Sequence, residues 1–316
     1  MKVSDFDYRL PPELVAQSPL PRRDASRLLV LRRAGGVEHR SFAEIPDLLR
    51  GETVYLNDTR VLRARLLLHR ETGGRVEALL VRRLGPRRWH CLLDASGRLR
   101  VGERLRVDGP RGAAIAEKDA VEGWVLEFDL EPDLERLGLP PLPPYIRRPA
   151  GPIDAERYQT VYAASDGSIA APTAGLHFTP EILGRLTTRR LTLHVGMGTF
   201  KPIKVEDLGE HRMHPEAFEI PEPPAAPVAA VGTTTCRALE TWARTGKTSG
   251  TTDLFIRPPF EFKAVKALLT NFHLPRSTLL VLVCAFAGRE RTLAAYEEAV
   301  KERYRFFSYG DAMLIL

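Results

Sequence analysis

The fold is constrained most strongly by a run of short strand-like segments between Val61 and Leu130. The segments are separated by glycine-bearing turns, among them Thr72-Gly73-Gly74 and Asp108-Gly109, and no helix of useful length fits between them. Short strands at this regular spacing are typical of a small β-barrel. Strands are predicted at residues 62–69, 75–81, 89–93, 104–107, 113–116 and 124–128.

The barrel segment interrupts a chain in which strands and helices alternate. After it, the proline-rich stretch LPPLPPYIRR at 139–148 favours a stiff, extended return to the rest of the chain. A chain of 316 residues can hold two domains, each with its own core. The predicted fold class is therefore α/β: a larger mixed α/β domain, residues 1–60 plus 149–316, with an inserted small, mainly antiparallel β-barrel domain at 61–148.

Elements outside the barrel are predicted from apolar runs and from the residues that begin and end helices. Strands are expected at 27–31, 53–56, 191–195, 228–231 and 254–256, with a last apolar strand after Asp311. Helices or helical turns are expected at 42–49, 181–187, 205–208, 236–241, 264–268 and 293–305.

Charge favours a polyanionic partner without identifying one. The net charge is +6, the isoelectric point is near 9.3, and arginines are dense in the predicted barrel. A basic barrel is a common way to hold a nucleic-acid backbone, but a solvated charged face explains the same residues. Both interpretations remain open on charge alone.

Nothing in the sequence indicates export or insertion into a membrane. The N-terminal stretch MKVSDFDYRL has acidic residues where a signal peptide has an apolar run, and the longest apolar run, 279–287, is too short to span a bilayer. Cys91, Cys236 and Cys284 lack the spacing of metal ligands, and any pairing leaves one thiol over. We expect a cytoplasmic protein with no membrane association, and a monomer because no long apolar surface stripe is evident.

The stretch IAAPTAGLHFT at 169–179 is the strongest candidate for a ligand-facing loop. It combines small residues with Thr173 and His177, and Gly175 allows a positive φ or a close approach of the backbone to another group. Thr179 and Pro180 then favour the start of a helix. A tight structural crossover, with a histidine that only satisfies a buried carbonyl, explains the same residues equally well.

Three other loops are rich in small or polar residues. The strand at 228–231 runs into Gly232-Thr233-Thr234-Thr235 and a helix, where unpaired N–H groups attract a carboxylate, although threonines are also ordinary helix caps. The stretch TNFHLP at 270–275 gathers polar side chains beside a proline, as in a loop that faces a ligand. Asn57-Asp58-Thr59-Arg60 closes a strand and fits either a turn or a site.

Two common kinds of site are disfavoured. Gly196 and Gly198 lack the third glycine and the following helix of a dinucleotide-binding fingerprint. His211 and His214 are three residues apart, but no third ligand is visible nearby, so we expect no metal site.

A set of sequence blocks, in order and across nearly the full length, is more specific than any single loop. The blocks are SDFDYRLPPELVAQSPL, LNDTRVLRARL, LPPYIRRP, ERYQTVYA, AAPTAGLHFT, LHVGMGTF, EHRMH, VGTTTCRALE, TNFHLPRSTLL and RYRFFSYGDAMLI. In these blocks the chain resembles the S-adenosylmethionine:tRNA ribosyltransferase-isomerase family of queuosine biosynthesis (the QueA family). The resemblance implies an α/β domain with an inserted β-barrel.

The resemblance also implies a reaction. Family members transfer the ribosyl group of S-adenosylmethionine to 7-aminomethyl-7-deazaguanine, the modified guanine at the wobble position of tRNA, and rearrange it to the epoxycyclopentanediol of epoxyqueuosine. Adenine and methionine are released. S-adenosylmethionine is thus consumed as a ribosyl donor, and no true cofactor is expected.

That reaction needs a base near the ribose, a proton or hydrogen-bond donors for the departing adenine, and a neutral acceptor amine. His177 and His273 are the leading candidates for proton transfer, with Asp58, Asp253 and Asp311 as alternative bases or orienting groups. Thr233 and Thr234 are expected to hold the methionine carboxylate. The other expected substrate-binding residues are Asn57, Arg60 and Asn271 for ribose hydroxyls or phosphate, Thr173, Gly175 and Gly232 in the small-residue loops, and Arg98 and Arg100 for tRNA.

The chain also departs from the family pattern. The segments near 221–228 and 246–252 are short, and the barrel loop at 92–100 differs, which puts its contact with tRNA in doubt. Two alternatives remain: a methyltransferase that uses S-adenosylmethionine on tRNA, and a non-catalytic tRNA-binding protein.

Overall fold

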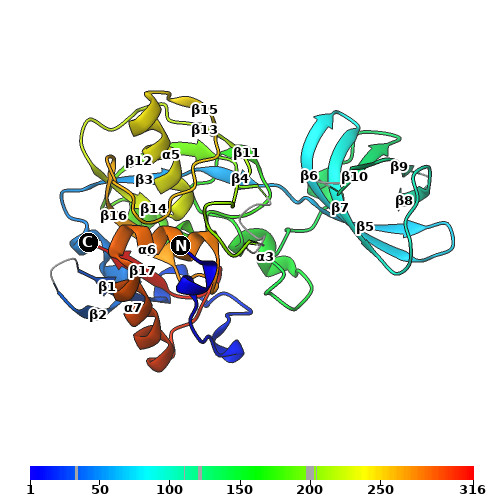
Figure 1. Cartoon of the computed structure of the whole chain (residues 1–316). Coiled ribbons are helices and arrows are strands. Elements are labelled where there is room, and N and C mark those ends of the chain that lie inside the picture. Colours follow the sequence, from blue (N-terminus) through cyan, green and yellow to red (C-terminus); the bar gives the residue numbers. More distant parts are fainter. Residues whose placement is uncertain (33–34, 110, 120–122, 197–202, 204) are drawn as a thin grey trace. The chain divides into compact units, whose positions relative to one another are not determined.

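The structure is a computed structural model that describes residues 1–32, 35–109, 111–119, 123–196, 203 and 205–316 (Figure 1). The chain forms two compact units. The larger comprises Met1–Arg60, Pro143–Arg148 and Arg157–Leu316, and the smaller comprises Val61–Leu142 and Pro149–Glu156. The proline-rich return is therefore divided. Pro143–Arg148 lies with the larger unit, where Gln17 donates to the carbonyl of Tyr145 and accepts from the backbone N–H of Arg147.

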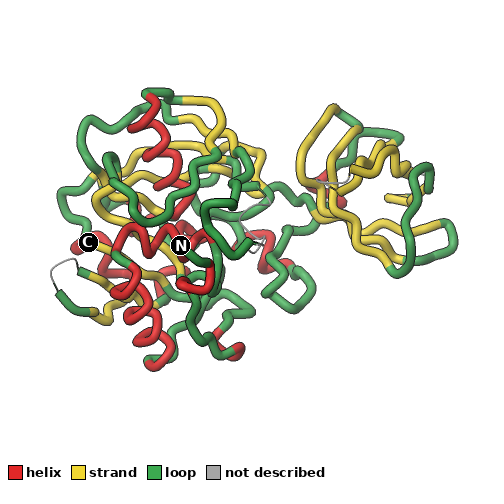
Figure 2. The backbone as a smooth tube through the Cα atoms, viewed as in Figure 1, coloured by secondary structure: helices red, strands yellow, loops and turns green. Residues whose placement is uncertain are grey.

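The smaller unit contains the closed barrel that the strand spacing predicts (Figure 2). Its strands follow one another around the barrel in the order β10 (Gly123–Phe128), β7 (Arg88–Ala95), β6 (Arg75–Gly85), β5 (Arg65–Arg70), β8 (Arg104–Asp108) and β9 (Arg111–Asp119). Every neighbouring pair is antiparallel. Along β6, Val76, Ala78 and Leu80 are buried at alternate positions, as expected where one face of a strand lines a barrel interior. One helical turn, α2 (Leu134–Leu137), follows β10.

The larger unit is built on a nine-stranded mixed sheet. Its order is β15 (Ser249–Thr252), β13 (Glu216–Glu219), β12 (Thr187–Leu193), β3 (Thr53–Asn57), β14 (Val228–Val231), β16 (Val265–Asn271), β17 (Ala312–Ile315), β1 (Arg27–Leu31) and β2 (Val37–Ser41). The four strands β12, β3, β14 and β16 are parallel to one another, β17 is antiparallel to β16, and β1 is parallel to β17. Separately, β4 (Thr59–Val61) and β11 (Ser165–Ser168) pair as a two-stranded sheet.

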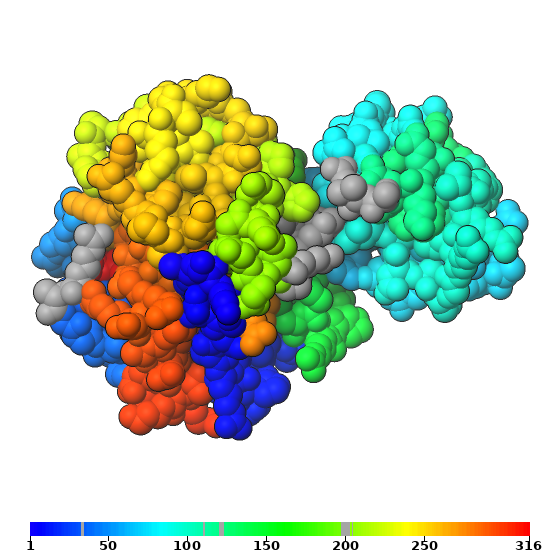
Figure 3. Space-filling model, in the orientation of Figure 1, coloured from blue at the N-terminus to red at the C-terminus, as the bar shows by residue number. Residues whose placement is uncertain are grey.

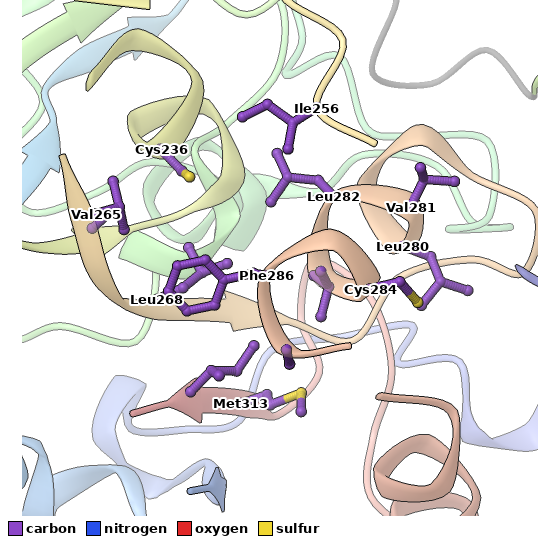
Figure 4. Close-up of a cluster of buried hydrophobic side chains, with 14 of the residues drawn as sticks. Cys236, Ile256, Val265, Leu268, Leu280, Val281, Leu282, Cys284, Phe286 and Met313 are labelled. Carbon is purple, nitrogen blue, oxygen red and sulfur yellow. The ribbon is translucent and has the colours of Figure 1, made fainter. Parts of the chain in front are cut away.

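Both faces of the nine-stranded sheet are covered, because successive residues of a strand face opposite sides. Leu268 and Met313 pack on one side with α5 (Thr233–Thr245), α6 (Thr278–Ala287) and α7 (Arg289–Lys301). Figure 4 shows this cluster, with Cys236 of α5 and Phe286 of α6 approaching the sheet. The sequence neighbour Leu269 packs on the other side with residues of α1 (Ile45–Leu48) and α4 (Pro180–Leu183).

The remaining helical segments are short. Helix α3 is Pro152–Arg157, and 3₁₀ turns lie at Val3–Phe6, Pro12–Leu14, Arg23–Ala25, Phe42–Glu44 and Thr173–Gly175. The N-terminal segment lies against the C-terminal part of the larger unit, blue beside orange in Figure 3, where the N–H of Arg276 donates to the carbonyl of Phe6 at 2.9 Å.

Three local predictions are wrong. Residues 264–268 begin the central strand β16 instead of forming a helical turn; a short apolar run fits either, and burial on both sheet faces selects the strand. Residues 254–256 have no regular structure, and the strand lies just before them at Ser249–Thr252. The described residues 205–208 are not helical; Glu206 and Asp207 instead pair with the backbone of Val3 and Lys2.

Candidate functional site

The site is built at one edge of the sheet in the larger unit. Because β12, β3, β14 and β16 are parallel, their carboxyl ends meet at that edge, which is where open α/β sheets bind ligands. Strand β17 is antiparallel to β16, so the residues before it reach the same edge. A pocket, called here the main pocket, lies there. Its lining comprises Pro144, Tyr145, Tyr158, Ala170, Ala171, Pro172, Thr173, Ala174, Val195, Gly232, Thr233, Thr234, Thr270, Asn271, Phe272, His273, Leu274, Ser277, Leu279, Phe307 and Ser308.

The N-terminus of α5 forms one wall of the main pocket. Gly232 precedes the helix at a φ of +91°, a conformation that residues with a side chain rarely adopt. Since Gly232 offers no side chain, the first turn has no side-chain cap, and its residues Thr233 and Thr234 line the main pocket. Unpaired helical N–H groups and the helix dipole together favour a bound carboxylate.

His273 lies on another wall, in the segment that follows β16. Its Nε2 is 2.7 Å from the hydroxyl of Thr270, and its backbone carbonyl accepts from the hydroxyl of Tyr8 at 2.5 Å. Burial lowers the pKa of His273 to about 3, so the ring is neutral near pH 7. A neutral imidazole held in one orientation can accept a proton from a ligand in the main pocket.

Asn271 connects the main pocket to His177. Its side-chain amide donates to the carbonyl of Phe307 at 3.0 Å and lies 3.2 Å from Nε2 of His177, while its Oδ1 has no partner among the described residues. If the amide donates, Nε2 of His177 is the acceptor, and Nδ1 then carries the proton and donates to Ser26 at 2.8 Å.

His177 itself does not line the main pocket. It contributes instead to a smaller hollow with Ser26, Arg23 and Arg157. Burial, together with nearby arginines, lowers its pKa to about 4, and its ring packs 5.0 Å from that of Phe42. Of the two histidines expected to transfer protons, His273 lines the main pocket, whereas His177 is connected to it through Asn271.

Gly175 is required by packing. A Cβ at this position would lie 2.1 Å from the hydroxyl oxygen of Tyr162 and 2.9 Å from Cγ2 of Thr160. The expected close approach of the backbone is therefore present, without a positive φ. Thr173, two residues earlier, does line the main pocket.

Other predicted site residues hold the backbone around the main pocket. Asn57 is fully buried and binds both backbone groups of Leu193, while its amide reaches the hydroxyl of Thr234 at 3.3 Å. Asp58 accepts from the hydroxyl of Thr192 at 2.7 Å. Neither Asn57 nor Asp58 lines the main pocket.

Asp311 is also buried away from the main pocket. It accepts from the backbone N–H groups of Arg27 and Arg305, each at 2.8 Å, and so joins the starts of β1 and β17. Burial raises the pKa of this carboxyl, against the opposing effect of these hydrogen bonds.

Four predicted residues lie on the surface. Arg60 forms an ion pair with Asp166 at 3.6 Å, and Asp253 is exposed beyond the end of β15. Neither lines the main pocket. Arg98 and Arg100 are exposed in the connection between β7 and β8 of the barrel, and their guanidinium groups make no ion pair with a described residue.

Many arginines of the barrel unit form ion pairs with acidic side chains. Ion pairs join Arg63 to Glu135, Arg65 to Glu77, Arg70 to Glu103, Arg83 to Glu131, Arg88 to Glu117 and Arg104 to Asp129. Arginine density alone therefore overstates the charge available to a polyanion. Arg98 and Arg100 are among the barrel cations that remain available.

Several pocket residues were not singled out from the sequence. Tyr145 and Tyr158 line the main pocket, and the hydroxyl of Tyr145 lies 2.7 Å from that of Ser308. Burial raises the pKa of Tyr145 to about 12, so its hydroxyl stays protonated. Phe307 lies beside them. All four residues lie within the blocks LPPYIRRP, ERYQTVYA and RYRFFSYGDAMLI, on which the family resemblance rests. Their residue types alone did not mark them as site residues.

Two other kinds of feature are absent from the part of the chain that the structure describes. Within that part, no cluster of three or more His, Cys, Asp or Glu side chains is placed to bind a metal ion. In the same ranges, no helix has the length and apolar character needed to cross a membrane. Residues 197–199, which follow the first glycine of the rejected dinucleotide motif, fall outside the described ranges.

Comparison with known proteins gives matches over the whole chain. The family described as "Queuosine biosynthesis protein" matches residues 3–315. The chain is 51% identical to the S-adenosylmethionine:tRNA ribosyltransferase-isomerase of Anaeromyxobacter sp. (strain Fw109-5), covering 100% of this chain and 99% of the relative. It is 49% identical to the protein of that name from Thermotoga maritima, with 100% of both chains covered.

A solved structure is similar as well. The crystal structure of S-adenosylmethionine tRNA ribosyltransferase from Thermotoga maritima matches with a TM-score of 0.54 and 38% identity, covering 99% of this chain and 100% of that one. With a match over nearly every residue and relatives half identical along their full length, this chain belongs to the queuosine biosynthesis protein family.

Proposed function

We propose that this chain transfers and isomerises the ribosyl moiety of S-adenosylmethionine onto 7-aminomethyl-7-deazaguanine at the wobble position of tRNA. The products are epoxyqueuosine-tRNA, adenine and methionine. The observation that carries the proposal is the full-length match to S-adenosylmethionine:tRNA ribosyltransferase-isomerases at about half identity. S-adenosylmethionine is consumed in this reaction, and no separate cofactor is required.

The main pocket is the proposed site for S-adenosylmethionine. The N-terminus of α5, with Thr233 and Thr234, provides N–H groups for the methionine carboxylate. Apolar walls from Ala171, Val195 and Leu279 suit the less polar parts of the ligand. This placement supports the expected roles of Gly232 and Thr173 in substrate binding.

Proton transfer is assigned to His273, which is neutral and lines the main pocket. The sulfonium acidifies the adjacent 5′ carbon, and a neutral imidazole can accept that proton. The departing adenine needs hydrogen-bond donors, which the protonated hydroxyls of Tyr145 and Ser308 can supply. In this proposal His177 positions Asn271, and Asp58 and Asp311 position backbone segments without transferring protons.

Binding of tRNA is assigned in part to Arg98 and Arg100 on the barrel. Their side chains are exposed and form no ion pair with a described residue, whereas an ion-paired arginine must give up a carboxylate before it binds phosphate. The proposal also keeps two expectations from the sequence, that the chain acts as a monomer and that it acts in the cytoplasm.

The direct test is to mix the protein with S-adenosylmethionine and an RNA hairpin that carries 7-aminomethyl-7-deazaguanine at its wobble position. We expect adenine and methionine in equal amounts, together with an RNA mass increase equal to the transferred ribosyl group. Release of S-adenosylhomocysteine would indicate a methyltransferase. Binding of the hairpin without any product would indicate a non-catalytic tRNA-binding protein.

A further inference from the structure

We infer that a second hollow beside the main pocket, called here the side groove, receives the acceptor nucleobase of the RNA. The inference rests on the proposed function and assigns a site to its second substrate. The side groove is a hollow that is open to solvent. Its lining comprises Tyr8, Leu10, Pro12, Val15, Gln17, Tyr145, Arg147, Leu274, Pro275 and Phe307.

The side groove adjoins the main pocket. The reaction forms a bond between the amine of the base and C1′ of the ribose, so the two substrates must touch. Tyr145, Leu274 and Phe307 line both the main pocket and the side groove. A base in the side groove would therefore lie next to a ligand in the main pocket, with these three residues beside the junction. Leu274 is 40% exposed at this junction, although it is apolar.

The walls of the side groove suit a nucleobase chemically. Proteins hold unpaired bases by stacking them on aromatic side chains and by enclosing them in apolar pockets. The side groove offers the half-buried rings of Tyr8 and Tyr145 with the buried ring of Phe307, and aliphatic side chains from Leu10 and Val15. A heterocycle fits these walls better than a ribose or a phosphate does.

The aromatic wall is also held rigidly. Phe307 has a φ of +70°, which is strained for a bulky side chain and persists only where the surroundings enforce it. Its N–H donates to the carbonyl of Phe272 at 3.1 Å, and its carbonyl accepts from Asn271 at 3.0 Å. Its ring centroid lies 4.7 Å from that of Tyr145. The strained residue thus fixes a ring pair on the wall that the main pocket and the side groove share.

A positive charge stands at the rim of the side groove. Arg147 is exposed there, and its guanidinium makes no hydrogen bond or ion pair with a described residue. Its backbone is held in place, because its N–H donates to Gln17 at 2.8 Å. A free cation beside an aromatic hollow matches a nucleotide, whose base enters the hollow while its phosphate stays at the rim.

Photochemical crosslinking tests the location without requiring activity. A tRNA hairpin with 6-thioguanine at the wobble position is irradiated with the full-length protein, and the crosslinked peptide is identified by mass spectrometry. We expect attachment within residues 8–17, 145–147 or 274–275. Attachment elsewhere would overturn the inference. Crosslinking in the side groove, combined with no adenine release from the modified hairpin, would retain the groove and reject the proposed function.

Kinetics then tests the wall residues that belong to the side groove alone. Tyr8→Leu should raise KM for the modified hairpin roughly 5- to 100-fold, the range for losing one stacked base. Tyr8→Phe keeps the ring and loses the hydrogen bond to the carbonyl of His273, so it should keep the wild-type KM for the hairpin even if turnover falls. KM for S-adenosylmethionine should stay within about twofold in both variants.

Arg147→Ala should lower the salt dependence of hairpin binding by a slope of about 0.7, as expected when one fewer phosphate is neutralised. Lys247→Ala is the matched control, because Lys247 is also exposed and its side chain pairs with no residue in the described ranges, but it lies outside the side groove. Unchanged hairpin affinity and slope in both Tyr8→Leu and Arg147→Ala, in an enzyme that releases adenine, would overturn the inference while leaving the proposed function standing.

Discussion

The two units of this protein differ in how deeply they bury an ion pair. In the larger unit, Arg237 and Glu216 form an ion pair in which each side chain is only 4% exposed. Glu216 also accepts from the N–H of Gly196, one residue after Val195 of the main pocket. In the barrel, Arg104 and Asp129 pair with 49% and 37% of their side chains exposed. The larger unit thus buries this pair almost completely near the main pocket, whereas the barrel pair stays in contact with solvent.

This difference fits two separate tasks. Chemistry needs groups whose positions do not change when the ligand binds, and burial with complete hydrogen bonding provides that. Contact with a flexible polyanion needs exposed cations, whose contribution weakens as salt rises. Changes in the larger unit should therefore affect catalysis and stability strongly, and changes on the barrel should affect mainly RNA affinity.

The largest effect is expected at His273. His273→Ala removes the neutral imidazole from the main pocket, and turnover should fall roughly 100- to 10,000-fold if that group transfers a proton. The measurement is adenine release at saturating S-adenosylmethionine and modified hairpin. His177→Ala provides the comparison, because His177 reaches the main pocket only through Asn271; its loss should be roughly tenfold.

The reverse order of the two histidine effects would move proton transfer to His177. A loss below tenfold in His273→Ala, with an unchanged melting temperature, would remove His273 from the mechanism.

Breaking the buried ion pair should give the next largest effect. Glu216→Gln leaves Arg237 charged and buried without its partner, which typically costs about 3–5 kcal/mol of unfolding free energy. Asp129→Asn breaks an exposed pair and should cause no measurable loss. Urea unfolding of the two variants measures both. Similar losses of unfolding free energy in both variants would mean that burial of the ion pair does not determine its contribution to stability.

Burial also decides how far the sequence could predict the fold. The barrel strands were recognisable because short strand-like runs recur at regular spacing between glycine-bearing turns. Strand β16 was mistaken for a helical turn, because its residues Val265, Ala267, Leu268 and Leu269 are buried on both faces and lack alternation. Where a segment is buried on both faces, tertiary contacts determine whether it forms a strand or a helix.

The residues of the candidate site could likewise be predicted only in part from the sequence. Thr233, Thr234, Asn271 and His273 could be found from the sequence because they lie at or just after the ends of strands, and the structure brings all four to the main pocket. Asn57 carried the same kind of local signal, yet its amide is used on the backbone of Leu193. Local sequence shows that a polar group follows a strand, but only the packing shows which way that group is turned.

The pH dependence of unfolding free energy reports whether the fold keeps the buried His177 neutral. The pKa of His177 is lowered to about 4 in the folded protein, against about 6.5 in the unfolded chain. Because only the unfolded chain takes up the proton over this range, stability is complete above pH 6.5, falls between pH 6.5 and 4, and levels off below pH 4. At about 1.36 kcal/mol per unit, the loss is about 3 kcal/mol.

Urea unfolding between pH 7.5 and 4 should show a shallower fall in His177→Asn than in the wild type. His69→Asn, at an exposed position on β5, should retain the wild-type dependence and serves as the control. Equal dependence on pH in all three proteins would mean that His177 is not held neutral by the fold.

The smallest effect is expected on the barrel, in RNA affinity. Replacing Arg98 and Arg100 by alanine should lower the slope of log binding constant against log salt by about 0.7–0.9 for each phosphate that is no longer neutralised, with turnover at saturating RNA unchanged. Arg83→Ala is the control, because Arg83 is ion-paired with Glu131 and its charge is already compensated. If Arg83→Ala lowers the slope as much as the unpaired arginines do, pairing does not decide which barrel cations meet RNA. If neither change lowers the slope, the tRNA backbone lies on other residues, and exposure of unpaired charge on the barrel is not the basis of binding.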